Sequence, residues 1–361
     1  MPRRQVRAQT ADSPRAHHGY AQFPPLHLLS ILLSVRTTRK LVSLVLLAMA
    51  AIASERQADA QTQAYPSRPI RWIVPVPAGA TADIVTRTIG QKLGERLGQQ
   101  VIVENRPGGV FVIGSDALAK AAPDGYTLGT LLTPHVVNPF VQKNLPYDTV
   151  RDFTPVTLMV IVPGVMTMNP GVPASTLEEL IALAKAKPGS LNYGSPGALT
   201  SGHLSMEMLK LAAGISITHI PYKGGAPAIA DLVGGQIQLL ISGPPGVLPH
   251  IRSGRLKAIA TTAAQRSPGL PEVPTFAESG LPGFDTYEWY GVFAPANLPG
   301  ELLAKLSQEI ARIIKLPEMS EQLTVQGAIP VGNSSDEFGA FIRREMEVWG
   351  KLAQRVGLRP D

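Results

Sequence analysis

The stretch Ile73–Gly90, IVPVPAGATADIVTRTIG, decides how this chain is expected to fold. An apolar run ends in a turn of Pro, Gly and Ala, and a helix pattern begins directly after it. Backbone amides at such a strand-to-helix turn point outward, and the helix dipole favours an anion in front of them. A core turn without a ligand is the alternative interpretation of this stretch alone. The expected helix buries one face and ends at Gly98, since apolar residues recur at every fourth position: Val85, Ile89, Leu93 and Leu97.

The first 60 residues carry most of the positive charge of the chain. They hold eight Lys/Arg against three Asp/Glu, which leaves 25 basic against 24 acidic residues in the remainder. The remainder has no runs of Lys or Arg interleaved with aromatic residues. The net charge of +6 therefore gives little support to nucleic-acid binding.

This basic segment, residues 1–60, has the pattern of an export signal. A charged region, Arg36–Lys40, precedes the apolar run Leu41–Ala53, and Ala58-Asp59-Ala60 is a small-x-small cleavage site before Gln61. The apolar run is shorter than the roughly 20 residues that a membrane-spanning helix needs. We expect translation to begin near Val35 and the mature protein to be soluble in the periplasm. The chain has no cysteine, which excludes disulfides and thiolate metal sites.

Strand and helix patterns alternate in two blocks along the rest of the chain. The expected fold class is α/β, and each block predicts a mostly parallel sheet flanked by helices. The chain leaves the first block near Pro163 and returns near Phe284. Two crossings of this kind are typical of hinged receptors, so we expect lobe 1 at residues 61–165 and 285–361, lobe 2 at residues 166–284, and a ligand cleft between them.

Helix boundaries are indicated by short local patterns. Ser175-Thr176-Leu177-Glu178 has the form of a capping box, and Ser334 with a Glu three residues later has the same form before a long helix. Between the strands Val101–Glu104 and Thr127–Leu132 the pattern predicts a helix over residues 115–122. Pro317–Val325 reads as another short helix.

Catalytic patterns are scarce in this sequence. G-x-S-x-G, a phosphate-binding loop, G-x-G-x-x-G after a strand and H-E-x-x-H are all missing. His135, His203, His219 and His250 lie too far apart in sequence for a local metal motif. We therefore expect no enzyme, no cofactor and no metal. His219 lies within an apolar strand pattern and is expected to be structural, whereas His203 at a helix start is a candidate to face a ligand.

Strand, small-residue turn and helix start recur at Pro77–Asp83, Gly194–His203 and Pro221–Pro227. Ligands of parallel sheets bind beyond the carboxyl ends of the strands, where these turns lie. If the first two turns come from opposite lobes, two positive helix ends face each other and suit a small carboxylate. The hydroxyl groups in these turns either donate to a ligand or cap the helices. We expect Asp83 to complement the helix dipole or to orient its loop.

The sequence resembles the extracytoplasmic receptors of tripartite tricarboxylate transporters, also called Bug receptors. The matching segments include YPSRPIRWIVPVPAGATAD, VIVENRPGG, HIPYKGGAPAIADLVGGQIQLLISG and RSPGLPEVPTFAESGLPGF, and the match extends over residues 65–361. The resemblance implies a two-lobed type II periplasmic binding fold, no catalysis, and capture of a small organic anion for membrane permease subunits, by a monomer. The expected ligand-binding residues are Val76, Pro77, Ala78, Gly79, Ala80, Thr81, Asp83, Thr133, Gly194, Ser195, Gly197, Ala198, Thr200, Ser201, His203, Tyr222 and Ser242.

Several positions depart from the pattern of this family. Ala80 stands where a second glycine is usual, Val76 where an aromatic is frequent, Leu199 where small or polar residues are usual, and Ser242 where many members have Asp. These changes leave the receptor role intact and the ligand open. The alternative function is a sensor that presents its solute to a membrane signalling protein. Genes for permease subunits or for a sensor kinase beside this one would distinguish the two.

Overall fold

The computed structural model describes residues 65–267 and 269–358 of the 361-residue chain. The expected export signal and its cleavage site lie outside the described residues. Within them, no helix has both the length and the apolar character that crossing a membrane requires.

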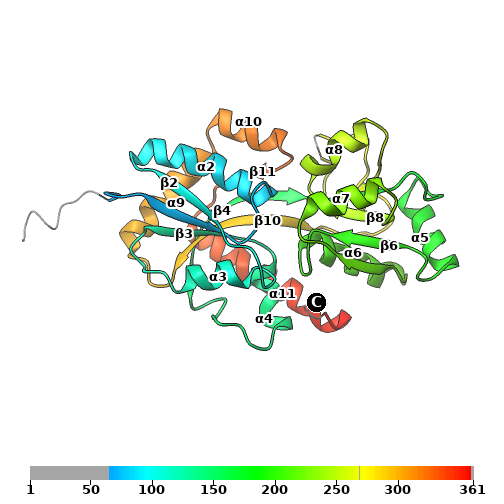
Figure 1. The fold of residues 1–361 in the computed structure, drawn as a ribbon, viewed down its shortest axis with the longest axis horizontal. Coiled ribbons are helices and arrows are strands. Elements are labelled where there is room, and N and C mark those ends of the chain that lie inside the picture. Colours follow the sequence, from blue (N-terminus) through cyan, green and yellow to red (C-terminus); the bar gives the residue numbers. More distant parts are fainter. Residues whose placement is uncertain (1–64, 268, 359–361) are drawn as a thin grey trace, which may run out of the picture. The chain divides into compact units, whose positions relative to one another are not determined.

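A six-stranded sheet forms one half of the described chain, in the order β11-β4-β10-β3-β1-β2 (Figure 1). β1 pairs in parallel with β2 and β3, as the alternating pattern predicts. β10 pairs antiparallel with β3 and β4, and β11 pairs antiparallel with β4. The strands are β1 (Ile70–Val74), β2 (Val101–Asn105), β3 (Thr127–Leu131), β4 (Phe153–Pro163), β10 (Tyr287–Pro295) and β11 (Ile329–Pro330).

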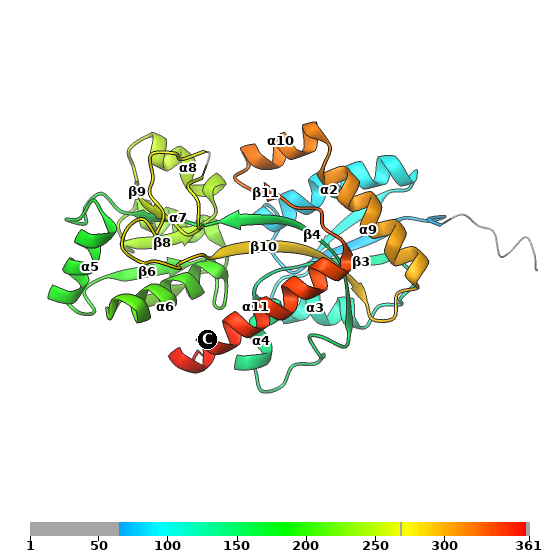
Figure 2. The ribbon, with the colours of Figure 1, turned by 180° about the vertical axis from the view of Figure 1, so that it is seen from behind.

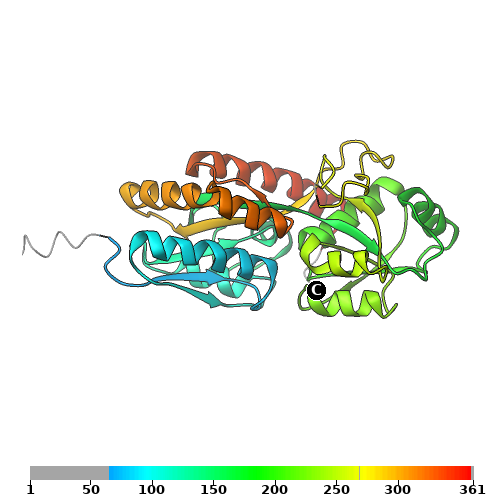
Figure 3. The ribbon, with the colours of Figure 1, turned by 90° about the horizontal axis from the view of Figure 1, so that it is seen from above.

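Helices cover both faces of this sheet, and each face has its own apolar core. On one face Trp72 and Ile89 lie in a core with residues of α2 (Thr81–Leu97), α9 (Gly300–Ile314) and α10 (Pro317–Val325). On the other face Trp289 and Phe338 lie in a core with residues of α3 (Val112–Ala119), α4 (Pro134–Val141) and α11 (Ser335–Val356). Figure 3 shows α2 and α9 side by side, in agreement with their contacts.

A five-stranded sheet forms the other half, in the order β7-β6-β8-β5-β9. β6 pairs in parallel with β7 and β8, whereas β5 pairs antiparallel with β8 and β9. The elements of this half are β5 (Val165–Met168), α5 (Leu177–Ala186), β6 (Asn192–Ser195), α6 (Ser201–Ala213), β7 (Thr218–Pro221), α7 (Gly225–Val233), β8 (Leu239–Ser242), α8 (Pro244–Arg252) and β9 (Lys257–Thr261).

The structure confirms an α/β fold with two sheets flanked by helices. The sheets are mixed instead of mostly parallel, because the strands that connect the halves run against their neighbours. Figure 2 shows β4 and β10 side by side between the two halves. The predicted alternation gave the parallel part of each sheet correctly, but hydrophobic periodicity does not encode the direction of a strand.

Three helix starts differ from the predictions. α3 begins at Val112 instead of residue 115, and α4 was not predicted, since its eight residues include two prolines, Pro134 and Pro139. α5 is capped by Thr176, whose hydroxyl accepts from the Glu179 amide, instead of by Ser175. The capping box of Ser334 with Glu337 and the bounds of α10 match the predictions.

Candidate ligand-binding site

The first predicted turn connects β1 to α2 and is exposed at its tip. Pro77, Ala78 and Gly79 are exposed, whereas Val76 is buried in the core beneath α2. Gly79 has φ +83°, a conformation that a side chain would strain. Ala80 is the N-cap of α2 and makes no side-chain capping bond. The first helical amides, from Thr81 onward, have no partner within the helix and are available in front of it.

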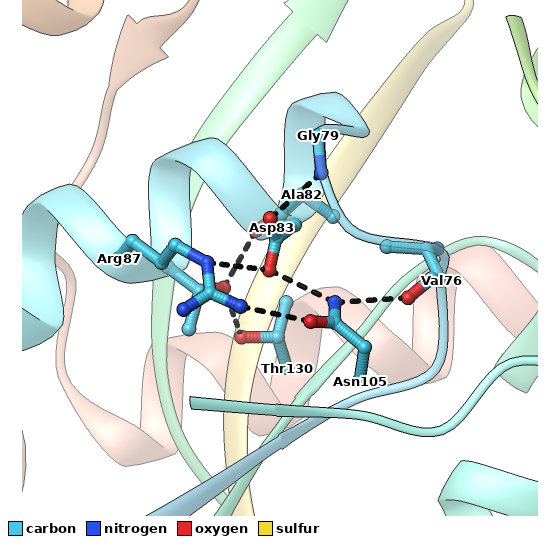
Figure 4. Close-up of polar contacts among 8 residues, drawn as sticks. Val76, Gly79, Ala82, Asp83, Arg87, Asn105 and Thr130 are labelled. Carbon is cyan, nitrogen blue, oxygen red and sulfur yellow. Dashed lines mark hydrogen bonds and ion pairs between the residues drawn. The ribbon is translucent and has the colours of Figure 1, made fainter. Parts of the chain in front are cut away.

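Asp83 is the residue that fixes this turn (Figure 4). Its buried carboxylate accepts from the Gly79 amide at 2.8 Å, from Asn105 Nδ2 at 2.8 Å and from Arg87 Nε at 3.0 Å. Burial raises the pKa of the Asp83 carboxyl, but the bonds from Arg87, Gly79 and Asn105 outweigh burial and hold that pKa below its usual value. Asp83 therefore orients the loop, which is one of its two predicted roles.

The second predicted turn connects β6 to α6, and aromatic and imidazole rings support it. The rings of His203 and His219 stack with centroids 4.0 Å apart, and Tyr193 stacks on His219 at 4.8 Å. Ser195, fully buried, lies 2.7 Å from His219 Nε2 and donates to the Gly197 carbonyl at 2.9 Å. His219 is thus structural, as the sequence predicted.

His203 acts on the turn itself. Its Nδ1 accepts from the Leu199 amide at 3.0 Å, which requires an unprotonated Nδ1. Burial, with smaller effects of His219 and Lys210, lowers the pKa of His203 to about 3. The imidazole is buried and neutral, so it holds the loop, and its predicted role as a ligand contact stays a prediction.

Leu199 connects this turn to the other half of the chain. It has φ +62°, is fully buried, and packs with Ala198 and Leu204 in the core that also contains Trp289 and Phe338. The Leu199 side chain, one of the departures from the family pattern, is therefore part of a shared core and makes no exposed pocket wall.

Glu288 joins the starts of two helices. One carboxylate oxygen accepts from the Thr133 amide at 3.0 Å and from its hydroxyl, at the start of α4; the other accepts from the Ser201 amide at 3.3 Å, at the start of α6. Burial raises the pKa of the Glu288 carboxyl, and the bonds from Thr133 and Ser201 oppose that increase without cancelling it. The structure thus brings together Thr133 and Ser201, two predicted ligand-binding residues, on a residue that was not predicted.

Sequence reasoning missed Glu288 because the stretch EWYGVFA reads as an ordinary strand. A charged residue among apolar neighbours was the available signal. Glu288 can bond the starts of α4 and α6 only because β10 runs beside both of them. That arrangement depends on segments far apart in the sequence.

The remaining predicted residues lie in the second turn or in the same half of the chain. The Thr200 hydroxyl donates to the Gly197 carbonyl at 2.8 Å, and Tyr222 donates to Asp231 on α7 at 2.7 Å. Gly194 is buried, and a side chain there would meet Ile237 and Tyr222. The Ser242 hydroxyl is buried and has no hydrogen-bond partner among the described residues. The same residues contain no group of three His, Asp or Glu placed to hold a metal ion.

The site thus contains two helix starts that follow strand ends, those of α2 and α6, and the start of α6 holds the Glu288 carboxylate. Residues 85–358 match the model of the tripartite tricarboxylate transporter family receptor. The chain belongs to this receptor family. Its relatives include protein BugT of Bordetella pertussis, 37% identical over 317 residues that cover 87% of this chain and 96% of BugT.

Several solved structures have a fold similar to that of this chain. Rpa4515 of R. palustris with adipate gives a TM-score of 0.78 at 34% identity, covering 82% of this chain and all of that one. MatC of Rhodopseudomonas palustris with bound malate gives 0.74 at 29% identity over 80% of this chain and 99% of MatC. The periplasmic binding protein BugD gives 0.76 at 31% identity over 82% of this chain and all of BugD. The receptor therefore has a periplasmic binding protein fold.

Proposed function

We propose that this receptor is exported, captures a small carboxylate in a cleft between two lobes, and presents it to the permease subunits of a tripartite transporter without transforming it. Lobe 1 consists of residues 61–165 and 285–361, and lobe 2 of residues 166–284. The turns before α2 and α6 contribute the two sides of the cleft. Both turns follow the carboxyl ends of parallel strands, which is where such folds bind ligands.

The observation that carries this proposal is the carboxylate already held at the start of α6. The Ser201 amide donates to a Glu288 oxygen at 3.3 Å, so this helix start has the geometry to bind a carboxylate. The start of α2 offers the same unpaired amides and the same positive dipole end, and its tip is exposed. Hydrogen bonds to a charged group each contribute about 1.5 to 3 kcal/mol.

The ligands of related receptors support the same class of solute. Rpa4515 was solved with adipate and MatC with malate, both of which are dicarboxylates. The helix starts and the hydroxyl groups near them supply hydrogen-bond donors for an anion. The Ser195 hydroxyl lies 2.7 Å from His219 Nε2, but Ser195 is fully buried and its hydroxyl donates to the Gly197 carbonyl, so it is not placed to attack a solute, which supports binding without catalysis.

A thermal-shift series with receptor stripped of bound ligand by denaturation, dialysis and refolding tests the proposal. The series contains succinate, malate, glutarate and adipate, the corresponding hydroxy acids, and adipamide as an uncharged control. A ligand at 100 times its Kd adds about 2.7 kcal/mol of stability. We expect at least one carboxylate to raise the melting temperature and adipamide to leave it unchanged. A shift with adipamide equal to that with adipate would contradict recognition of a carboxylate.

A further inference from the structure

Glu288 lies on the side of β10 that faces the start of α2. Side chains alternate along a strand, and Trp289 packs in the core shared with α11, whereas Tyr290 packs in the core beneath α2. The Tyr290 hydroxyl lies beside the side chain of Thr81, the first residue of α2. Glu288 therefore lies two positions along β10 from Tyr290, which is next to the start of α2. The Glu288 carboxylate itself accepts a hydrogen bond at the start of α6.

Hydrogen-bond donors surround the carboxylate of Glu288. Thr133 donates its amide and its hydroxyl, and Ser201 donates its amide. The Trp289 amide donates at 3.3 Å. Glu288 as a residue is half-buried, and its carboxylate is anchored at both helix starts.

The hydrogen bonds to this carboxylate come from neutral groups. The donors that contact the Glu288 oxygens belong to Thr133, Ser201 and Trp289, and these donors carry no charge and do not titrate. The titratable groups that interact with it are Tyr290 on β10 and Glu345 on α11. Tyr290 and Glu345 are both negative when ionised, so neither of them can compensate the charge of Glu288. The site therefore presents one fixed negative charge at its α6 end.

We propose that Glu288 determines the specificity of this receptor by occupying the α6 end of the site with its own carboxylate, so that the ligand brings one carboxylate to the start of α2 and a hydroxyl or amino group toward Glu288. A hydroxyl or ammonium group donates to the Glu288 oxygens, whereas a second ligand carboxylate meets a like charge. The favoured solutes are hydroxy or amino monocarboxylates. This inference rests on the proposed function.

The test is a ratio of affinities for ligands of equal length. Isothermal titration at pH 8 compares 4-hydroxybutyrate with succinate, 5-hydroxyvalerate with glutarate, and 6-hydroxyhexanoate with adipate. We expect the wild-type receptor to bind the hydroxy acid of the fitting length at least tenfold more tightly than the matched dicarboxylate. Glu288→Gln and Glu288→Ser, which both remove the charge, are expected to lower that ratio at least tenfold.

Glu345→Gln is the matched control. Glu345 is also a carboxylate whose pKa is raised, mainly by burial, but it accepts hydrogen bonds from Trp349 and Tyr287 instead of from Thr133 and Ser201. Because Glu345 interacts with Glu288 through its charge alone, its substitution is expected to lower the ratio less than either Glu288 variant does. Because a ratio compares two ligands on one protein, partial loss of stability in a variant does not imitate the expected result.

The pH dependence of the affinity for the dicarboxylate, measured by titration at pH 6 and pH 8, is a second test of the role of Glu288. A dianion that approaches Glu288 favours its protonated form, so wild-type affinity for the dicarboxylate is expected to be higher at pH 6, and that of Glu288→Gln to be the same at both values. A wild-type receptor that prefers the dicarboxylate at pH 8, or an unchanged ratio in both Glu288 variants, overturns this inference while the proposed function stands. Absence of binding by every carboxylate overturns both.

Discussion

The turns before α2 and α6 have the same plan and are stabilised in opposite ways. The first has an exposed tip and is held by charge, since Asp83 bonds Gly79, Arg87 and Asn105 within its own half of the chain. The second is buried and is held by stacked rings, by the His203 bond to Leu199, and by packing against the other half. The comparison indicates that the exposed tip of the first turn can move without disturbing a core, whereas movement of the second turn disturbs the core that it shares with the other half.

Leu199→Ala should have the largest effect on stability. Leu199 is fully buried in the core shared by the two halves, and removal of a buried Leu side chain costs about 3 kcal/mol. Leu211→Ala on α6 is the matched control, because Leu211 is half exposed and the same change should cost less than about 1 kcal/mol. Urea unfolding measures both values. Equal costs would show that the second turn is not anchored by packing.

Gly79→Asp should weaken binding of a carboxylate by about a hundredfold, or about 2.7 kcal/mol. The substitution places a second negative charge at the exposed start of α2, where the positive helix end is proposed to bind the ligand. Gly98→Asp is the control, since Gly98 also has a positive φ and open space around it but lies at the other end of α2. Calorimetric titration with the best ligand of the thermal-shift series would compare the two. Similar losses in both variants would locate the ligand elsewhere.

Asp83→Ala should lower the free energy of unfolding by about 2 kcal/mol, because it leaves the Gly79 amide and two side-chain donors without their acceptor. Arg87 is about half exposed, so its ion pair with Asp83 adds little beyond the hydrogen bond. Glu95→Ala, which removes an exposed ion pair from the same helix, should cost less than about 0.5 kcal/mol. Chemical denaturation of both variants would measure the difference, and a loss in Asp83→Ala no larger than in Glu95→Ala would contradict the role of Asp83 in holding the first turn.

His203 should make the second turn sensitive to acid. Its folded pKa of about 3 lies below the ordinary value of 6.5, so its contribution to stability is complete above pH 6.5 and is lost as the pH falls. Between pH 6.5 and pH 5 the loss from this one group amounts to roughly 2 kcal/mol. His203→Gln should flatten the pH dependence by that amount in unfolding measurements at pH 7 and pH 5. An unchanged slope would mean that His203 is protonated in the folded receptor or is not buried in solution.

The sequence predicted both turns because their signals are local. A strand pattern, small residues and a helix period stand next to one another at Ile73–Gly90 and again around Gly194. The first helix has its αL C-cap at Gly98, as expected, and the second has the same kind of cap at Gly214. The resemblance to a receptor family supplied the two-sheet fold. The antiparallel course of β4 and β10 depends on pairing between distant segments, which periodicity does not encode.

Individual side-chain roles were harder to predict than the turns that carry them. Thr176 and Ser175 are both suitable caps by residue type, and backbone conformation selects Thr176. Glu288 acquires its part only because β10 runs past the starts of α4 and α6. The ligand-binding roles of Gly79, Ser195 and the other predicted residues remain predictions that the experiments above test.

Tyr222→Phe should have the smallest effect and separates support of the second turn from ligand contact. The Tyr222 hydroxyl donates to Asp231 on α7 at 2.7 Å, and burial, with the hydrogen bond and charge of Asp231, raises its pKa to about 12. Because that hydroxyl is already engaged away from α6, its removal should cost about 1 kcal/mol of stability and change ligand affinity by less than twofold. Titration and urea unfolding of the same preparation measure the two quantities. A tenfold loss of affinity with unchanged stability would instead show that the hydroxyl leaves Asp231 to bind the ligand, and the second turn would then bind its solute through side chains as well as amides.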